Sequence, residues 1–292
     1  MSRRHLGACG AVLSSEVFDS FVGALLPVGG VVVAIIQAFF DESYGEKVGS
    51  ILCVAGYMMT DRAARRLTRE WNAVLREYDL PYFRMSACAH GNYPFNKLTK
   101  NQRVAVETKM IGLIKRRTIK GIGVTVNVDE FGKIMPDNRE VIGGAYSVCL
   151  NVVLGGAYHW AKHMGFTSRL AYFFEAGHNN QSEADRILTR AFSMEDLRTS
   201  RSYAGHGFVR KEDSPPTQAA DILAWQWYTD LRHKIEGKKR RADCASLLEH
   251  DHDVRHIPPE FLLALVLKWN RIRPGLDLDF ARFALSYKGD GG

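Results

Sequence analysis

Three acidic residues stand at positions in this sequence where a charge is costly to bury. Asp41 ends an unbroken apolar run, VVVAIIQAFF, and Glu175 ends a second apolar segment, LAYFF. Asp221 lies within the apolar helical segment AADILAW. A carboxylate in apolar surroundings needs a paired cation or a metal ion, and such groups gather at functional sites. These three residues are therefore our candidates for catalytic, metal-binding carboxylates.

Each of these acids also has a purely structural interpretation. The strand of residues 31–40 can simply stop at Asp41, so that the carboxylates of Asp41 and Glu42 face water. The carboxylate of Asp221 can accept hydrogen bonds from the backbone where its helix packs. The distances among the three carboxyl groups distinguish these interpretations from a shared site.

Apolar periodicity predicts the elements that must position these acids. Alternating or continuous apolar runs predict strands, and apolar residues at three- and four-residue steps predict helices. The expected strands are residues 31–40, 51–59, 122–128, 170–174 and 204–210. The expected helices are residues 61–80, 99–117, 144–164, 181–194, 215–233 and 258–271, with a loop at 82–98 and a short apolar element at 281–287.

The order of these elements predicts an α/β fold of the ribonuclease H-like type. A three-stranded meander, with a helical insertion between its second and third strands, precedes alternating helices and strands. We expect a mixed five-stranded sheet flanked by helices over residues 31–235. Residues 1–30 are expected to be an N-terminal extension, and residues 236–292 a C-terminal helical extension packed on the same domain. That fold builds its site from carboxylates on the first strand, at the end of the fourth strand and on the closing helix, which are the positions of the three acids.

Two segments carry a resemblance to a known family. The sequence FFDES at residues 39–43 and the sequence QAADILAW at residues 218–225 resemble the domain of unknown function 3800 family. The resemblance covers roughly residues 33–235 and includes the helices that contain Trp71, Tyr146 and Cys149. It implies a ribonuclease H-like, metal-dependent nuclease of bacteria, archaea and phages whose biological role is mostly unassigned.

This sequence departs from the family pattern at two positions. Arg84 stands where relatives often have a histidine, and Glu175 stands where they often have an aspartate. The first change puts any carried-over role for that loop in doubt. The second lengthens a ligand without removing it.

The three acids match what phosphodiester cleavage requires. Mg²⁺ and Mn²⁺ prefer oxygen ligands, so one or two such ions are the expected cofactors. Two ions about 3.5 to 4 Å apart would activate a water and stabilise the leaving oxygen. In this hypothesis Asp41 bridges both ions, while Glu175 and Asp221 each hold one.

Five further residues are supporting candidates. Glu42 or Asp185 is the candidate fourth ligand, and Gln218, one helical turn before the third acid, would orient that carboxylate or a bound water. His178 would protonate a leaving group, and Ser43 would donate a hydrogen bond to a phosphate. His178 and Ser43 also fit ordinary turn residues.

The charge of the chain is compatible with a nucleic-acid partner, either DNA or RNA. Lys and Arg total 39 against 32 Asp and Glu, a formal net charge of +7. Two groups are the candidate nucleic-acid contacts: Arg62, Arg65, Arg66 and Arg69 on one helix, and Lys238, Lys239, Arg240 and Arg241 in a loop. A charged helix face or loop is also often simply solvated.

A competing hypothesis is a non-catalytic member of the same fold that binds nucleic acid or protein, as a phage, defence or toxin component. The expected helix at residues 144–164 carries no acid that would complete a metal site. A protein partner or a homodimer is compatible with either hypothesis.

Other features of the sequence narrow the class of protein. The five cysteines are scattered and never form a C-x-x-C pair, so neither a disulfide framework nor a zinc site is indicated, and reduced thiols fit a cytoplasmic location. Glu16 and Asp19 interrupt the first apolar stretch, which argues against a signal peptide, and no run predicts a membrane helix or a membrane partner. The tract HDHDVRH at residues 250–256 could bind a transition metal, but no apolar scaffold surrounds it, so a solvated loop is expected.

Overall fold

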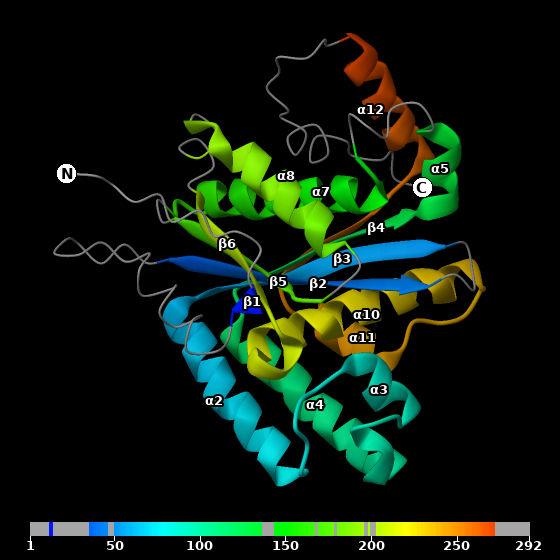
Figure 1. The fold of residues 1–292 in the computed structure, drawn as a ribbon. Helices are drawn as coiled ribbons and strands as arrows, with labels where there is room; N and C mark the ends of the chain where they lie inside the picture. The colour runs from blue at the N-terminus through cyan, green and yellow to red at the C-terminus, as the bar shows by residue number, and fades with distance from the viewer. Residues whose placement is uncertain are drawn as a thin grey trace, which may run out of the picture.

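Figure 1 shows a central sheet with helices on both of its faces in the computed structural model. The structure describes residues 12–13, 35–45, 50–135, 143–166, 169–177, 180–195, 198 and 203–271. Over these residues the sheet has seven strands in the order β1-β6-β5-β2-β3-β4-β7, and β1 contributes only two residues. The strands are β1 (Val12–Leu13), β2 (Ile36–Gly45), β3 (Ile51–Thr60), β4 (Lys120–Asn127), β5 (Leu170–Glu175), β6 (Tyr203–Val209) and β7 (His252–Ile257).

The centre of the sheet is β2, which has one antiparallel and one parallel neighbour. Antiparallel pairing joins β2 to β3 and β3 to β4, whereas β2 pairs in parallel with β5 and β5 with β6. Phe39 stacks on Phe173 on one face and Phe40 on Phe174 on the other, with ring centroids 5.0 and 5.8 Å apart. These pairs favour the observed register, because a slip by one residue would exchange the two faces.

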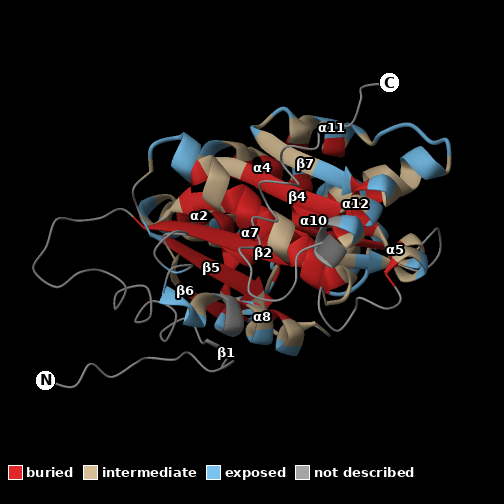
Figure 2. Cartoon of the chain, turned by 90° about the horizontal axis from the view of Figure 1, so that it is seen from above, coloured by how far each residue is buried: buried red, intermediate tan, exposed pale blue. Residues whose placement is uncertain are grey.

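Two layers of helices cover the sheet. One layer contains α2 (Asp61–Glu77), α3 (Met85–His90), α4 (Lys100–Arg117), α10 (Pro215–Ile235) and α11 (Ala242–Leu248). The other contains α5 (Val128–Ile134), α7 (Ala145–His163), α8 (Gln181–Ser193) and α12 (Pro259–Arg271). Each layer packs on its own hydrophobic core, so the central strands are buried on both faces (Figure 2). This is why β2, β3 and β5 read as continuous apolar runs in the sequence.

Capping residues begin the helices where the sequence predicts them. The side chain of Thr60 accepts a hydrogen bond from the first turn of α2. Thr99 forms a capping box with Gln102 at the start of α4, and Ser214 precedes Pro215 at the start of α10. The helical insertion between β3 and β4 is confirmed, because α2, α3 and α4 all lie there.

The expected five-stranded sheet is wrong, because the described part of the chain adds a strand at each edge. Residues 250–256 were expected to be a solvated loop, but most of this tract forms β7, which pairs in parallel with β4. The C-terminal extension is therefore not purely helical. Val12 and Leu13, expected in an extension, form β1 beside β6. Residues 1–11, 14–34 and 272–292, which include the expected element at 281–287, lie outside the described residues.

Three further boundaries differ from expectation. The strand expected to stop at Phe40 continues as β2 to Gly45, because β3 offers it an antiparallel partner along its whole length. Residues 82–98, expected to be a loop, contain α3 and the short 3-10 helix η1 (Phe95–Lys97). Val128 begins α5 rather than ending β4. Within the described residues, no helix is long and apolar enough to cross a membrane.

Two histidines of the C-terminal tract lie against hydroxyl groups, one at the end of α4 and one in β3. His250 Nε2 lies 2.8 Å from Thr118 Oγ1, and His252 Nε2 lies 3.1 Å from Tyr57 OH. Because His252 Nδ1 donates to a backbone carbonyl, the Nε2 of the neutral ring accepts from the tyrosine hydroxyl. Burial lowers the pKa of both histidines, that of His252 to about 4. Burial therefore favours the neutral imidazole at His250, just before β7, and at His252, the first residue of β7.

We expect the protein to lose stability as the pH falls from 6.5 to 4 because of His252. Burial lowers the pKa of His252 from 6.5 to about 4, so the unfolded chain binds a proton in this window that the folded chain does not bind. The full shift corresponds to about 3 kcal/mol of unfolding free energy. Urea unfolding between pH 7 and 4 should show a shallower pH dependence for His252→Asn than for the wild type. The control is His90→Asn at an exposed histidine, and an equal effect of the two substitutions would contradict the role assigned to His252.

Candidate active site

The strand β2 carries Asp41 into the interior of the molecule. Successive residues of a strand face opposite sides, so Asp41 lies on the α10 side with Phe39, whereas Glu42 lies on the α7 side. The side chain of Asp41 is 0% exposed, and its Oδ1 accepts a hydrogen bond from Glu42 N at 2.7 Å. The interpretation that Asp41 faces water at the end of a strand is therefore wrong.

Two other elements bring carboxylates to the same place. Glu175 is the last residue of β5, the parallel neighbour of β2, and its side chain remains 22% exposed. Asp221 lies in the second turn of α10, which packs across β2 and β3. The Oδ2 of Asp221 accepts a hydrogen bond from the backbone N–H of Met85 at the start of α3. Three elements that are distant in sequence thus each contribute one acid.

A lysine that the sequence analysis did not select lies at the centre of these acids. Lys211 Nζ lies 2.9 Å from Asp41 Oδ2, 2.9 Å from Glu175 Oε2 and 2.9 Å from Asp221 Oδ1. The three carboxylates therefore share one site, with their contacting oxygens no farther from each other than twice this distance. Lys211 belongs to the 3-10 turn η2 (Lys211–Asp213) between β6 and α10, and its side chain is only 5% exposed.

The sequence gives little indication of this role for Lys211. The residue lies in the polar stretch RKEDS, which is typical of a surface connection. Its one signal is position, since it follows β6 and precedes the cap of α10 by three residues. Only the fold brings its ammonium to the acids of β2 and β5.

Burial and repulsion between like charges determine the charge state of the cluster. Burial raises the pKa of Asp41 to about 7, Lys211 opposes this shift, and the nearby Glu175 adds to it. Burial also raises the pKa of Asp221 against the same ammonium. Burial disfavours the charged form of Lys211, but the carboxylates, Asp221 first, raise its pKa well above the ordinary value. One ammonium does not balance three buried carboxylates, so the site retains an excess of negative charge.

The donor set fits a hard divalent cation, and Lys211 stands where that cation would lie. Asp41, Glu175 and Asp221 supply carboxylate oxygens, the ligands that Mg²⁺ and Mn²⁺ prefer. Among the described residues, no group of three His, Cys, Asp or Glu side chains is already arranged to hold a metal ion. The three acids are arranged around an ammonium instead. Metal binding by these acids thus requires the Lys211 side chain to leave the centre.

Gln218 supports the site by linking neighbouring segments of the chain rather than by orienting Asp221. Its Oε1 accepts hydrogen bonds from Trp71 Nε1 and from Phe83 N, each at 2.8 Å. Its Nε2 donates to the carbonyl oxygen of Lys211 at 2.8 Å. This fully buried side chain thus ties α2, the segment before α3 and the turn η2 to α10. The expected role, orientation of the Asp221 carboxylate, is not the one observed.

Glu42, a candidate fourth ligand, lies next to Asp41 in β2 but points to the other side of the sheet. Glu42 accepts a hydrogen bond from Asn180 Nδ2 at 3.0 Å on the opposite side of the sheet from Asp41. Glu42 also lines a cavity of about 10 Å³ together with Asp41, Glu175 and Tyr146. This volume is about that needed by one water molecule.

Asp185 does not join the carboxylate cluster. It lies on α8 and pairs with His206, with Asp185 Oδ1 and His206 Nε2 3.2 Å apart. Ser43 is a half-buried residue of β2, two positions beyond Asp41. His178 lies outside the described residues.

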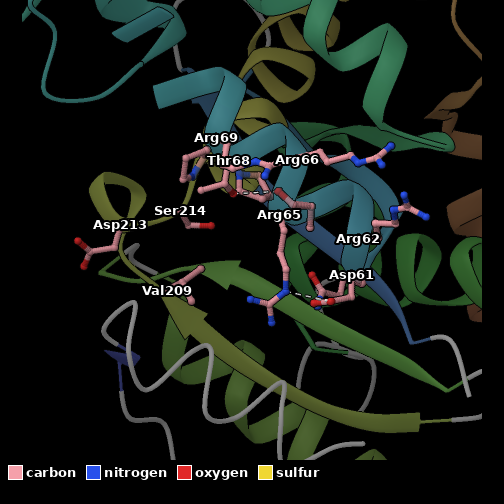
Figure 3. Close-up of a pocket in the computed structure, with 13 residues that line it drawn as sticks. Asp61, Arg62, Arg65, Arg66, Thr68, Arg69, Val209, Asp213 and Ser214 are labelled. Carbon is pink, nitrogen blue, oxygen red and sulfur yellow. Dashed lines mark hydrogen bonds and ion pairs between the residues drawn. The ribbon is translucent and has the colours of Figure 1, made fainter. Parts of the chain in front are cut away.

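The arginine-bearing face of α2 forms one wall of a groove of about 710 Å³ (Figure 3). Arg65 is held by Asp61, with Nε 3.0 Å from Oδ2, whereas Arg62 and Arg66 extend away from this pair. Arg62, Arg66 and Arg69 form no ion pair with another described residue. Three of the four candidate arginines therefore keep their charge available for a ligand.

The groove adjoins the carboxylate site. Val209, which lines the groove, is the partner of Glu175 in the pairing of β5 with β6. Ser214, which also lines the groove, follows Lys211 by three residues and caps α10. The connection from β6 to α10 thus forms part of both features.

The second basic group is largely neutralised by nearby acids. Arg240 makes two hydrogen bonds to Asp230, at 2.8 and 2.7 Å, and Arg241 binds Asp243 while lying over the ring of Trp225. Lys238 Nζ lies 2.6 Å from Glu236 Oε2, and Lys239 is exposed. This group follows the C-terminal end of α10, whereas Asp221 lies near its N-terminal end. The arginines of α2 are therefore the better candidates for contacting a ligand at the site.

Comparisons with known proteins give no independent assignment for this site. No family model matches the chain, and no curated protein matches its sequence. The chemistry of the site must therefore be inferred from its own side chains.

We expect Gln218→Ala to destabilise the protein by about 3 kcal/mol or more, because it leaves the buried Trp71 Nε1–H and Phe83 N–H without a partner and removes one of the two donors to the Lys211 carbonyl. Urea unfolding at constant pH measures this loss. The control is Gln102→Ala, which removes an exposed capping-box residue and should cost about 1 kcal/mol. Equal effects of the two substitutions would contradict the structural role assigned to Gln218.

Proposed function

We propose that this chain is a metal-dependent nuclease of the ribonuclease H-like class, which cleaves phosphodiester bonds in DNA or RNA. The observation that carries this proposal is the convergence of Asp41, Glu175 and Asp221 on one buried point. Acids that are retained in a buried cluster at a cost to stability are typical of catalytic sites.

The strand order supports this class of fold. The run β4-β3-β2-β5-β6, antiparallel over its first three strands and parallel beyond them, is the order that we expect for a ribonuclease H-like core. Within that core the acids occupy the first strand, the end of the fourth strand and the closing helix. The same placement supports the resemblance to the domain of unknown function 3800 family, because FFDES falls in β2 and QAADILAW falls in α10.

Asp41, Glu175 and Asp221 would hold Mg²⁺ or Mn²⁺ in this proposal. A divalent cation bound there would supply an activated water and stabilise the leaving oxygen of the cleaved phosphodiester. Asp41 lies deepest and contributes charge in a position closed to solvent. Glu175 is the most exposed of the three acids and faces the side from which a substrate can approach. The backbone N–H of Met85 holds Asp221 in place as the substrate binds.

The arginines of α2 are proposed to bind the phosphates of the substrate. Arg62, Arg66 and Arg69 keep uncompensated charge beside a groove that adjoins Glu175 through Val209. Guanidinium groups suit phosphate oxygens because they donate two parallel hydrogen bonds. A strand held along this groove would present its backbone to the acidic cluster.

One observation favours a second candidate function. Lys211 fills the centre of the cluster, so a non-catalytic protein that binds nucleic acid or another protein would have the same arrangement. In that alternative the lysine is a permanent structural partner of the three acids. The excess of negative charge around it favours the catalytic proposal, because a purely structural ion network would be better balanced.

We expect Asp41→Asn and Asp221→Asn to lower Mg²⁺- or Mn²⁺-dependent cleavage of DNA or RNA by at least about 100-fold. Each change keeps the shape of the side chain but removes the charge that binds the cation. Gel assays with single-stranded and double-stranded substrates measure the cleavage. The matched control is Asp230→Asn, which breaks an ion pair with Arg240 near the other end of α10 and should leave cleavage unchanged. Absence of cleavage by the wild type on every substrate with both ions would favour the non-catalytic alternative.

We expect the arginines of α2 to set the salt dependence of nucleic-acid binding. Replacing Arg62, Arg66 or Arg69 by Gln should reduce the slope of log K against log salt by about 0.7 to 0.9 for each phosphate that the variant no longer binds. Fluorescence anisotropy with a labelled oligonucleotide, in Ca²⁺ or without metal, measures this slope. Arg240→Gln is the control, because Arg240 is already paired with Asp230. Equal slopes for the α2 variants and the control would exclude this groove as the binding surface.

A further inference from the structure

We propose that Lys211 is a positioning residue that acts as an internal cation: its ammonium holds the three acids together without metal and must be displaced when a divalent ion binds. This inference rests on the proposed function, since it takes the three acids as metal ligands. It assigns a role to a residue outside the motifs that suggested the site. The carrying observation is the set of three contacts of 2.9 Å that Lys211 Nζ makes with Asp41, Glu175 and Asp221.

The position of the ammonium makes it a competitor of the metal. The carboxylate oxygens that would bind a cation are the oxygens that contact Nζ. A divalent ion and an ammonium repel each other and cannot occupy the same centre. The two cations are therefore alternative occupants, and each binds at the expense of the other.

The backbone of Lys211 is fixed, so the exchange involves the side chain alone. Gln218 Nε2 donates to the carbonyl oxygen of Lys211, and Ser214 N donates to the same carbonyl at 3.2 Å. Asp213 is held by Arg210, with Arg210 Nε 2.7 Å from Asp213 Oδ2. A lysine side chain has four rotatable bonds, so its ammonium can move several ångströms while this turn stays in place.

The solvent exposure of the three acids determines the direction in which the ammonium can leave the cluster. Asp41 is closed to solvent and Asp221 is 10% exposed, whereas Glu175 is 22% exposed. The solvent edge of the cluster therefore lies beside Glu175. Val209, the partner of Glu175 in the pairing of β5 with β6, lines the groove, so an ammonium displaced past Glu175 would move toward the surface proposed to bind substrate phosphates.

The cost of displacing Lys211 reduces the apparent affinity for metal. If less than about a tenth of the protein has the ammonium out of the centre, the apparent dissociation constant is raised about tenfold or more over that of the vacant site. Lys211→Met keeps the length of the side chain and removes the competing charge. This variant should bind Mn²⁺ about tenfold more tightly than the wild type, and its melting temperature should be lower without metal and rise more when Mn²⁺ is added.

The test has two parts. Calorimetric titration measures Mn²⁺ binding by the wild type, by Lys211→Met and by the control Lys120→Met, and a labelling experiment is carried out on the wild type. Lys120 pairs with Asp251 and with none of the three acids, so its substitution should not change Mn²⁺ affinity. An amine-reactive reagent and mass spectrometry then measure modification of Lys211 in the wild type, which avoids any loss of folding in the variant. Modification should be slow without metal and several-fold faster with saturating Mn²⁺.

The outcomes separate this inference from the proposed function. Tighter Mn²⁺ binding by Lys211→Met and metal-dependent labelling of Lys211 support the inference. If these results are obtained but no protein cleaves nucleic acid, only the nuclease proposal is lost. The inference is overturned if the wild type binds Mn²⁺ and cleaves nucleic acid while Lys211 stays protected from labelling. It is also overturned if Lys211→Met binds Mn²⁺ with unchanged or weaker affinity. Either result leaves the nuclease proposal standing. Lack of Mn²⁺ binding by both proteins overturns both.

Discussion

The contact between one buried ammonium and three buried carboxylates is the interaction on which the candidate site depends. Without Lys211, the acids of β2, β5 and α10 would face one another in an apolar interior, where like charges at this separation cannot all remain ionised. Burial, with a smaller contribution from Glu175, raises the pKa of Asp41 to about 7 even though the ammonium opposes this shift. A site with this charge distribution has a stronger attraction for an added cation than for an added anion.

The scaffold around these charges is organised to hold the turn η2 and the helix α10 in one arrangement. Gln218 connects the carbonyl of Lys211 to Trp71 of α2 and to the backbone of Phe83. The N–H of Met85 then binds the carboxylate of Asp221. The helical insertion between β3 and β4 is therefore part of the site, because it supplies the indole donor and the backbone donors that bind Gln218 and Asp221.

The distribution of basic residues follows the same organisation. On α2, three arginines stay without ion pairs among the described residues and line a groove next to the acids. Beyond the C-terminal end of α10, Arg240 and Arg241 are bound by Asp230 and Asp243. The two segments contain the same number of basic residues but differ in the hydrogen-bond donors available to a polyanion. A guanidinium paired with a carboxylate has already used the hydrogen bonds that recognise phosphate.

Local sequence patterns were sufficient to identify most of the elements and three of the four charged groups at the centre. Apolar runs marked β2, β3 and β5 because strands buried on both faces cannot alternate, and Thr60, Thr99 and Ser214 marked helix starts because their side chains cap them. The acids were visible because a carboxylate next to an apolar run is unusual.

The three-dimensional arrangement was needed to show what lies between those acids and which strands complete the sheet. Lys211 and Gln218 act through contacts with residues far away in sequence, and a lysine in a polar turn has no local pattern that distinguishes a buried ammonium from a solvated one. The strand β7 was missed because its charged and histidine residues resemble a loop, while its stability comes from pairing with β4 and from the hydroxyl groups of Tyr57 and Thr125 that its imidazoles meet. Local sequence sets the propensity of a segment, but the partner that satisfies a buried charge or a strand edge is chosen by the fold.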